Sequence, residues 1–341
     1  INILTKIIKM TTCPRGEIGR HKGLKILARK GVPVRVWPRA PIFMKNFKIC
    51  VHIPLYLEKR KKKQLNNFKK VCSSFLKFSK RTELFIHCNK KIKSNNKRTK
   101  FIFHSFKNTH PFKLTWHCRD LMESQKNDYD IFIYCEDDLL FTKKNFKYWL
   151  SHKDNCIKNN YNLGFLRVEV NKKNKKLYST DQVARSEYYV NLLNKKYVVL
   201  NNSNCSFWIY DKEEFSEFIK TKHWKFDWKW ISISDILLIR EMAAVGWHGQ
   251  NMNGLDMGRY LGTIVPLKNR KVDNRSFIRH LPDNYANAPR GLFGTFRMSD
   301  IVEKDLKKFQ PITSVGKFFK RVKYMIYHIS RINIKRYIKK N

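Results

Sequence analysis

Between residues 47 and 138 the sequence alternates short apolar runs with stretches of helical periodicity. Four runs have the length and the β-branched and aromatic composition of buried strands: 47–53, 83–88, 100–106 and 130–135. Apolar residues recur at helical spacing at 59–78 and again from 111 to 122. This order of elements predicts an α/β fold with a mostly parallel sheet, covered by helices on both faces.

The pattern is less regular beyond residue 140. Further strands are predicted at 162–170, 177–183, 197–200 and 206–210. Helices are predicted at 145–150, 212–220 and 234–244, with Gly246 as a plausible helix stop. The segment 254–288 contains Gly, Pro and Asn throughout, so we expect irregular structure there.

Three consecutive acidic residues, Glu136, Asp137 and Asp138, directly follow the apolar run at 130–135. At the carboxyl end of a parallel strand such side chains project into the crevice where open α/β sheets bind ligands. Adjacent carboxylates repel each other unless a cation neutralises them, and their oxygens suit Mg²⁺ or Mn²⁺. The cluster therefore predicts a metal site, the alternative being an acidic turn before a helix.

Residues 129–150 read YDIFIYCEDDLLFTKKNFKYWL. This stretch resembles the metal-binding region of nucleotide-sugar glycosyltransferases of the GT-A fold. It is similar to the Glu-Asp-Asp motif of the N-acetylglucosaminyltransferase I family and, more loosely, to the lipopolysaccharide glycosyltransferases. The resemblance implies that Asp138 binds Mn²⁺ or Mg²⁺, while Glu136 and Asp137 face the ribose and base of the nucleotide. The strand order from 44 to 138 extends the resemblance, and beyond Asp138 only the general layout matches.

The resemblance also implies nucleotide contacts upstream of the acids. His52 and Pro54 fill the family position near the end of the first strand, and Thr115 and Arg119 fill the position on the helix before the acids. For Arg119 a salt bridge to a neighbouring helix residue is equally open. His280 matches a late histidine that adds a metal or phosphate contact in some GT-A enzymes, although a lone histidine is more often structural.

Inverting enzymes of this fold use a carboxylate as the general base on the acceptor hydroxyl. Asp235 is the best candidate because it opens a predicted helix after an aromatic-rich loop. A helix-capping role for Asp235 is equally open, and Asp227 and Glu241 are weaker candidates. Three nearby tryptophans, at 224, 228 and 230, are candidates for stacking on a sugar or for packing in the core.

The expected function is a glycosyltransferase of hexosyl or N-acetylhexosaminyl type. We expect it to invert the anomeric configuration, although the sequence leaves a retaining reaction open. It would move a sugar from a nucleotide-sugar donor to a cell-surface glycan or a lipid-linked acceptor. The alternative is a nucleic-acid-binding protein without catalysis, because the formal net charge is +44. The sequence lacks zinc-ligand spacing, an aromatic RNA-binding strand and a helix-turn-helix signature. We therefore expect no specific nucleic-acid partner.

Residues 13–41 resemble the conceptual translation of a bacterial leucine transfer-RNA gene. We therefore expect 1–43 to be a non-native or disordered extension and translation to begin at Met44, with a basic targeting arm as the alternative. The expected GT-A-like catalytic domain spans 44–300. A basic helical tail is expected to follow at 301–341.

Residues 314–340 place apolar side chains along one broad helical face and carry basic but no acidic residues. Such a basic amphipathic helix is predicted to bind an anionic membrane surface, although packing on the domain is the alternative. No apolar run reaches the roughly 20 residues of a membrane-spanning helix. The eight cysteines form no Cys-x-x-Cys pair, which favours a reducing compartment. We expect a cytoplasmic protein at the inner face of the membrane.

Overall fold

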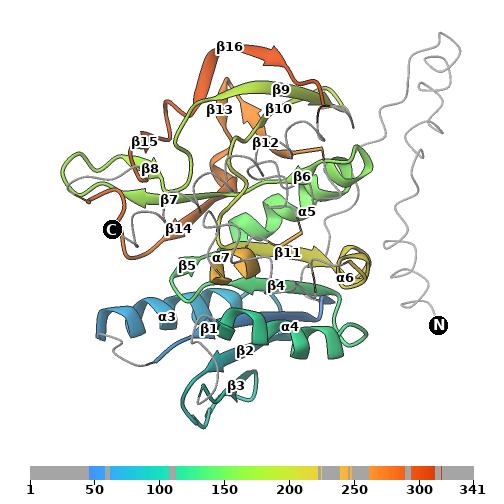
Figure 1. Ribbon diagram of the computed structural model, residues 1–341, viewed down its shortest axis with the longest axis vertical. Coiled ribbons are helices and arrows are strands. Elements are labelled where there is room, and N and C mark those ends of the chain that lie inside the picture. The colour runs from blue at the N-terminus through green and yellow to red at the C-terminus, as the bar shows by residue number, and fades with distance from the viewer. Residues whose placement is uncertain are drawn as a thin grey trace, which may run out of the picture. The chain divides into compact units, whose positions relative to one another are not determined.

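The computed structural model describes residues 46–57, 62–106, 113–221, 224, 239–244, 246–247, 261–288, 293–311 and 316. All of them belong to the compact unit Lys45–Asn341. This part of the chain is α/β, with three sheets and flanking helices (Figure 1). The expected extension at 1–43 lies outside the described residues, as does the tail at 314–340 except for Gly316.

The first sheet is built from five strands. They are β1 Ile49–Leu55, β2 Thr82–Cys88, β3 Thr99–Phe103, β4 Ile131–Cys135 and β11 Phe207–Asp211. Their spatial order is β11-β4-β1-β2-β3, in which β1 to β4 run parallel and β11 runs antiparallel to β4. The four strands predicted before residue 136 are thus confirmed, with small shifts at their ends.

Two amphipathic helices cover opposite faces of this sheet. Helix α3 (Lys62–Phe75) places Phe75 against Phe141, which stacks on Phe207 of β11 with the ring centroids 4.4 Å apart. Helix α4 (Leu114–Ser124) packs Cys118 and Met122 into a cluster that contains Trp208, the next residue of β11. Because consecutive strand residues point to opposite faces, the two helices lie on the two sides of the sheet.

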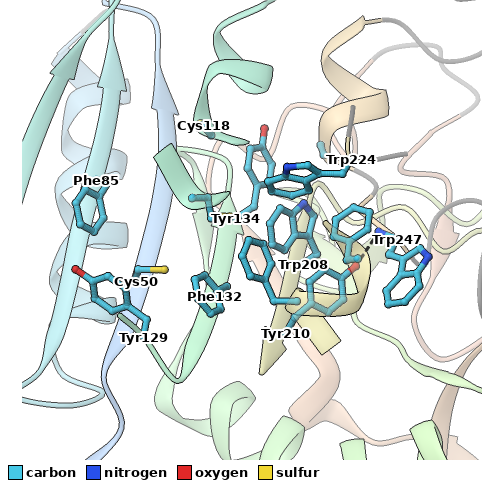
Figure 2. Packing of buried hydrophobic residues seen from close by; sticks show 14 residues of the cluster. Cys50, Phe85, Cys118, Tyr129, Phe132, Tyr134, Trp208, Tyr210, Trp224 and Trp247 are labelled. Atoms are coloured by element: carbon cyan, nitrogen blue, oxygen red, sulfur yellow. Dashed lines mark hydrogen bonds between the residues drawn. The ribbon is translucent and has the colours of Figure 1, made fainter. Parts of the chain in front are cut away.

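The core beside α4 is strongly aromatic. Figure 2 shows Phe132 and Tyr134 of β4 beside Trp208 and Tyr210 of β11. Helix α6 (Lys212–Phe218) adds further rings to this cluster, and α7 (Ile239–Ala244) contributes Ala244. Trp224, considered as a sugar platform, is 3% exposed and belongs to this core, whereas 228 and 230 lie outside the described residues.

Two further sheets lie beyond β11 and mix parallel with antiparallel pairs. One contains β6 Asn162–Leu163, β9 Ser186–Leu192, β10 Lys195–Val199, β12 Thr263–Lys268, β13 Lys271–Val272 and β16 Val302–Lys308. The other contains β5 Leu139–Leu140, β7 Leu166–Val170, β8 Leu177–Ser179, β14 Phe277–His280 and β15 Phe296–Arg297. The expectation of a mostly parallel sheet therefore holds only for the first sheet.

The segment 254–288, expected to be irregular, contributes β12, β13 and β14 where it is described. β12 pairs with β10 and with β6, and β14 pairs with β7 and β5. The strand β16 pairs with β9, so the sheet structure continues past residue 300, where a helical tail was expected. These strands depend on partners far away in the sequence, which local periodicity does not reveal.

Helix α5 (Lys143–Lys158) begins directly after β5 and is longer than the predicted 145–150. Thr142 caps it and forms a capping box with Asn145. In the part of the chain that the structure describes, no helix is both long and apolar enough to traverse a bilayer.

Candidate active site

Glu136, Asp137 and Asp138 follow the last residue of β4, a strand that is buried along its whole length. β4 lies between β1 and β11, so the acids stand at the carboxyl end of a central strand. The side chains of Glu136 and Asp138 are 26% and 23% exposed, whereas Asp137 is buried. Two of the three carboxylates can therefore meet a ligand in this conformation.

The chain brings His280 to Asp138 through a short antiparallel pairing. His280, the last residue of β14, lies opposite Leu139, and the backbone N–H of Leu281 donates to the Asp138 carbonyl at 3.0 Å. His280 Nε2 thereby comes within 3.4 Å of Asp138 Oδ2. The structure thus brings together the two residues that sequence reasoning had named as metal ligands.

Glu169 holds the other side of the His280 ring. Its Oε1 lies 2.5 Å from His280 Nδ1, and its Oε2 accepts the backbone N–H of Ala286 at 2.6 Å. Glu169 is fully buried. Because a carboxylate only accepts, Nδ1 carries a proton and Nε2 is the nitrogen that faces Asp138.

A carboxylate lies beside each nitrogen of the His280 imidazole. Burial alone would lower the pKa of His280, but hydrogen bonds with Asp138 and Glu169 raise it to about 9. Without a metal, the ring is thus an imidazolium between two carboxylates at neutral pH. A metal at Nε2 would take the place of one proton, since ligands bind in their deprotonated form.

Arg167 forms a second buried network behind Glu136. It lies on β7 two residues before Glu169, so both side chains point to the same face. Its guanidinium donates to both carboxylate oxygens of Asp181, at 2.6 and 3.0 Å, and its Nη1 lies 3.8 Å from Glu136 Oε2. Burial and the charges of Asp138 and Asp137 raise the pKa of Glu136 to about 7, and Arg167 opposes this shift.

Asp138 supplies a carboxylate oxygen, which suits Mg²⁺ and Mn²⁺, and His280 supplies an imidazole nitrogen, which suits transition metals, so the pair fits Mn²⁺ better than Mg²⁺. Two neighbouring ligands of an octahedral metal at about 2.1 Å lie roughly 3 Å apart, close to the separation of 3.4 Å in the structure. Among the described residues, no group of three or more His, Cys, Asp or Glu side chains is arranged to hold a metal. Two protein ligands fit a metal that also binds substrate phosphates.

His52 and Pro54, expected near the nucleotide, lie inside β1 and are buried. His52 Nε2 is 3.0 Å from Gln125 Oε1, and His52 Nδ1 is 2.9 Å from His87 Nε2. His87 Nδ1 is in turn 2.8 Å from His104 Nε2. Because the Gln125 oxygen only accepts, every ring in this row carries its proton on Nε2. Both ring nitrogens of His52 are occupied, so its surroundings do not support a nucleotide contact.

Arg119, the second expected nucleotide contact, is a buried cross-link. It donates to the carbonyl oxygens of Trp224 at 3.0 Å and Ala243 at 3.2 Å. Its guanidinium lies over the rings of Trp116 and Trp224, and burial lowers its pKa to about 10. Thr115, on the same helix, is also buried. The surroundings of Arg119 favour a structural role that ties α4 to α7.

The candidate base Asp235 and the weaker candidate Asp227 lie outside the described residues. Sequence reasoning did not single out Arg167, and it assigned no role to Glu169 or Asp181. One signal was available, because Arg167 and Glu169 alternate with apolar residues in a run of strand length. Charged residues on one face of a buried strand must find partners there.

The chain matches no model of a known protein family, and no curated protein matches its sequence. The site is therefore interpreted from its own residues. Its defining feature is the contact between the partly exposed Asp138 and the buried His280, which is set in two buried carboxylate networks.

Proposed function

We propose that this chain is a metal-dependent glycosyltransferase that uses a nucleotide-sugar donor. The observation that carries the proposal is the placement of His280 Nε2 beside Asp138 Oδ2 at the carboxyl end of β4. A buried carboxylate, Glu169, fixes the orientation of that histidine. Carboxylate–histidine pairs of this kind orient metal ligands and tune their basicity.

Asp138 and His280 would hold Mn²⁺ or Mg²⁺. A bound divalent ion supplies charge that stabilises a departing nucleoside diphosphate. Glu169 keeps His280 in place, and Arg167, held by Asp181, keeps the Glu136 carboxylate beside the pair. Glu136 is partly exposed and can accept hydrogen bonds from a ribose or a sugar, the role that the GT-A resemblance implies.

The donor is proposed to carry a hexosyl or N-acetylhexosaminyl group, and the acceptor to be a cell-surface glycan or a lipid-linked saccharide. Asp235 remains the proposed general base for an inverting reaction. A tail at 314–340 that binds anionic lipid at the inner face of the membrane would bring the enzyme to lipid-linked acceptors. The GT-A resemblance supports the proposed donor, acceptor and general base. The charge pattern of the tail supports the proposed membrane binding.

The test is release of nucleoside diphosphate from a panel of nucleotide sugars, with Mn²⁺, with Mg²⁺ and with chelator. Asp138→Asn and His280→Gln should reduce release by about a hundredfold or more, the scale expected for the loss of metal assistance. Asp305→Asn, at an exposed position of β16, is the matched control and should retain parent activity. Full activity in chelator, or equal activity in all variants, would refute the metal-dependent mechanism.

A further inference from the structure

A groove of about 890 Å³ lies at the far end of β14 from His280. Its wall combines the β12–β13 hairpin, the 3-10 helix Asn274–Ser276, the start of α5 and the residues that follow β15. Its volume is typical of sites that take a small molecule. Val272, Phe277 and Met298 form an apolar part of its lining. Val272 belongs to a buried hydrophobic cluster, and Phe277 and Met298 pack against that cluster.

Among the described residues, four basic side chains line the groove, Lys144, Lys268, Lys271 and Arg275, against a single acid, Asp273. Arg275 neutralises that acid through bonds from Nε and Nη2, the shorter being 2.6 Å. The side chain of Asp273 is only 10% exposed. The three lysines therefore set the sign of the charge in the groove.

Lys268 and Lys271 stand directly opposite each other across the hairpin. The turn between them uses two residues with positive φ, Asn269 at 50° and Arg270 at 59°, as a two-residue hairpin requires. Like charges in directly opposed positions destabilise a strand pair. In the described part of the chain no carboxylate pairs with either lysine. An anion bound between the two ammonium groups would remove that repulsion.

Three side-chain hydrogen bonds hold the part of the wall next to α5. Asn145 of α5 donates to the carbonyl oxygens of Arg275 at 2.7 Å and Phe277 at 2.8 Å. Lys144 Nζ donates to Asn274 Oδ1 at 2.9 Å. The segment leading into β14 is thereby fixed to the helix, so an incoming ligand meets a preformed surface.

We propose that this groove binds an acidic saccharide, through a carboxylate or a phosphate that sits between Lys268 and Lys271. Amide and hydroxyl groups of Asn269, Asn274 and Ser299 line the same groove and suit the hydroxyl groups of a sugar. Single-stranded nucleic acid is disfavoured because it is bound on exposed aromatic rings. Phe277 is the one aromatic ring that the described residues contribute to the lining, and it is half-buried. The choice of a saccharide over another small anion rests on the proposed transferase function.

The groove is separate from the Asp138–His280 pair. Phe277 and His280 are three residues apart on β14, which places their Cα atoms about 10 Å apart. An odd separation in a strand turns the two side chains to opposite faces. The groove therefore binds a part of the acceptor that is remote from the reacting sugar, or a separate acidic saccharide.

The test measures binding directly with the full chain, without metal or donor. Labelled sialyllactose is the probe and carries a carboxylate. Glucose 6-phosphate is a competitor that carries a phosphate, and lactose is the neutral competitor. We expect both acidic sugars to bind and lactose not to compete. Lys268→Glu with Lys271→Glu should weaken binding by about tenfold or more, since two charge-assisted hydrogen bonds are lost. Lys304→Glu with Lys307→Glu makes the same charge change on exposed positions of β16 and should have little effect.

An equal loss of binding in both double variants would overturn the proposal, because it would show attraction to net charge alone. Effective competition by lactose would also overturn it. A single-stranded oligonucleotide that binds more tightly than the acidic sugars and depends on the same two lysines would assign the groove to nucleic acid instead. Mn²⁺ binding by the Asp138 and His280 variants is measured separately. A groove that does not bind saccharide and a metal pair that does not bind Mn²⁺ are therefore detected by different measurements.

Discussion

Glu169→Gln is the substitution that tests most directly how His280 is held. The Glu169 carboxylate accepts two hydrogen bonds, from His280 Nδ1 at 2.5 Å and from the Ala286 backbone N–H at 2.6 Å. A glutamine has the same size but only one oxygen, so it cannot accept both. If the oxygen remains with Ala286, the amide N–H₂ faces Nδ1 and the ring proton must move to Nε2. That proton then blocks the nitrogen that faces Asp138.

If the amide is flipped, His280 keeps its tautomer but the buried N–H of Ala286 loses its acceptor. Such an unsatisfied donor costs about 1–3 kcal/mol. We therefore expect the amide oxygen to remain on the Ala286 N–H and His280 Nε2 to be lost as a metal ligand. Partners that orient a ligating histidine typically change metal affinity by about 10–100-fold when mutated. This corresponds to about 1.4–2.7 kcal/mol of binding free energy.

The assay is Mn²⁺ binding by isothermal titration calorimetry, with thermal unfolding to verify the fold. Glu83→Gln is the matched control, because Glu83 is also an acid that accepts two hydrogen bonds, from Lys100 and Tyr129, but it is partly exposed and lies on β2. Glu83→Gln should bind Mn²⁺ like the parent. Parent-like Mn²⁺ affinity in a folded Glu169→Gln protein would refute the role assigned to Glu169.

Three predictions concern stability, measured by urea unfolding. Gly246→Ala should lower the free energy of unfolding by about 1–3 kcal/mol, because Gly246 has a φ of 63° and an added Cβ would lie 2.6 Å from Trp208 Cδ1. Gly262→Ala, with its nearest neighbour 3.5 Å away, should cost less, and equal losses would contradict the reasoning. Thr142→Ala should cost about 1 kcal/mol through loss of the α5 cap, and an unchanged stability would show that the cap contributes nothing. Burial lowers the pKa of His52 to about 3. Between pH 6.5 and 3 the unfolded chain therefore binds more protons at His52 than the folded chain does, so the free energy of unfolding falls as the pH decreases through this range. At pH 5 this loss should be about 2 kcal/mol for His52, and a His52→Asn variant with the parent's full pH dependence would refute it.

The candidate site could be predicted only in part. Glu136 to Asp138 were recognisable because a buried strand and three adjacent acids form one local pattern. His280 was named from a family resemblance alone, since no local feature marks it. Glu169 and Arg167 acquire a role only when β7 and β14 lie side by side. Arg119 was expected to bind nucleotide, but the rings that surround it come from segments about a hundred residues apart.

The sequence by itself determined the alternation of strands and helices before residue 136 and the position of the acids at a strand end. Hydrophobic periodicity records these features because each element buries a face that its own residues define. Only the tertiary structure decided which strands pair beyond residue 140, where the row of histidines from His52 to His104 lies, and that His280 meets Asp138. The histidine contacts join residues 17 to 142 positions apart, and the free energy that selects them comes from burying charges and rings against partners that no short window of sequence contains.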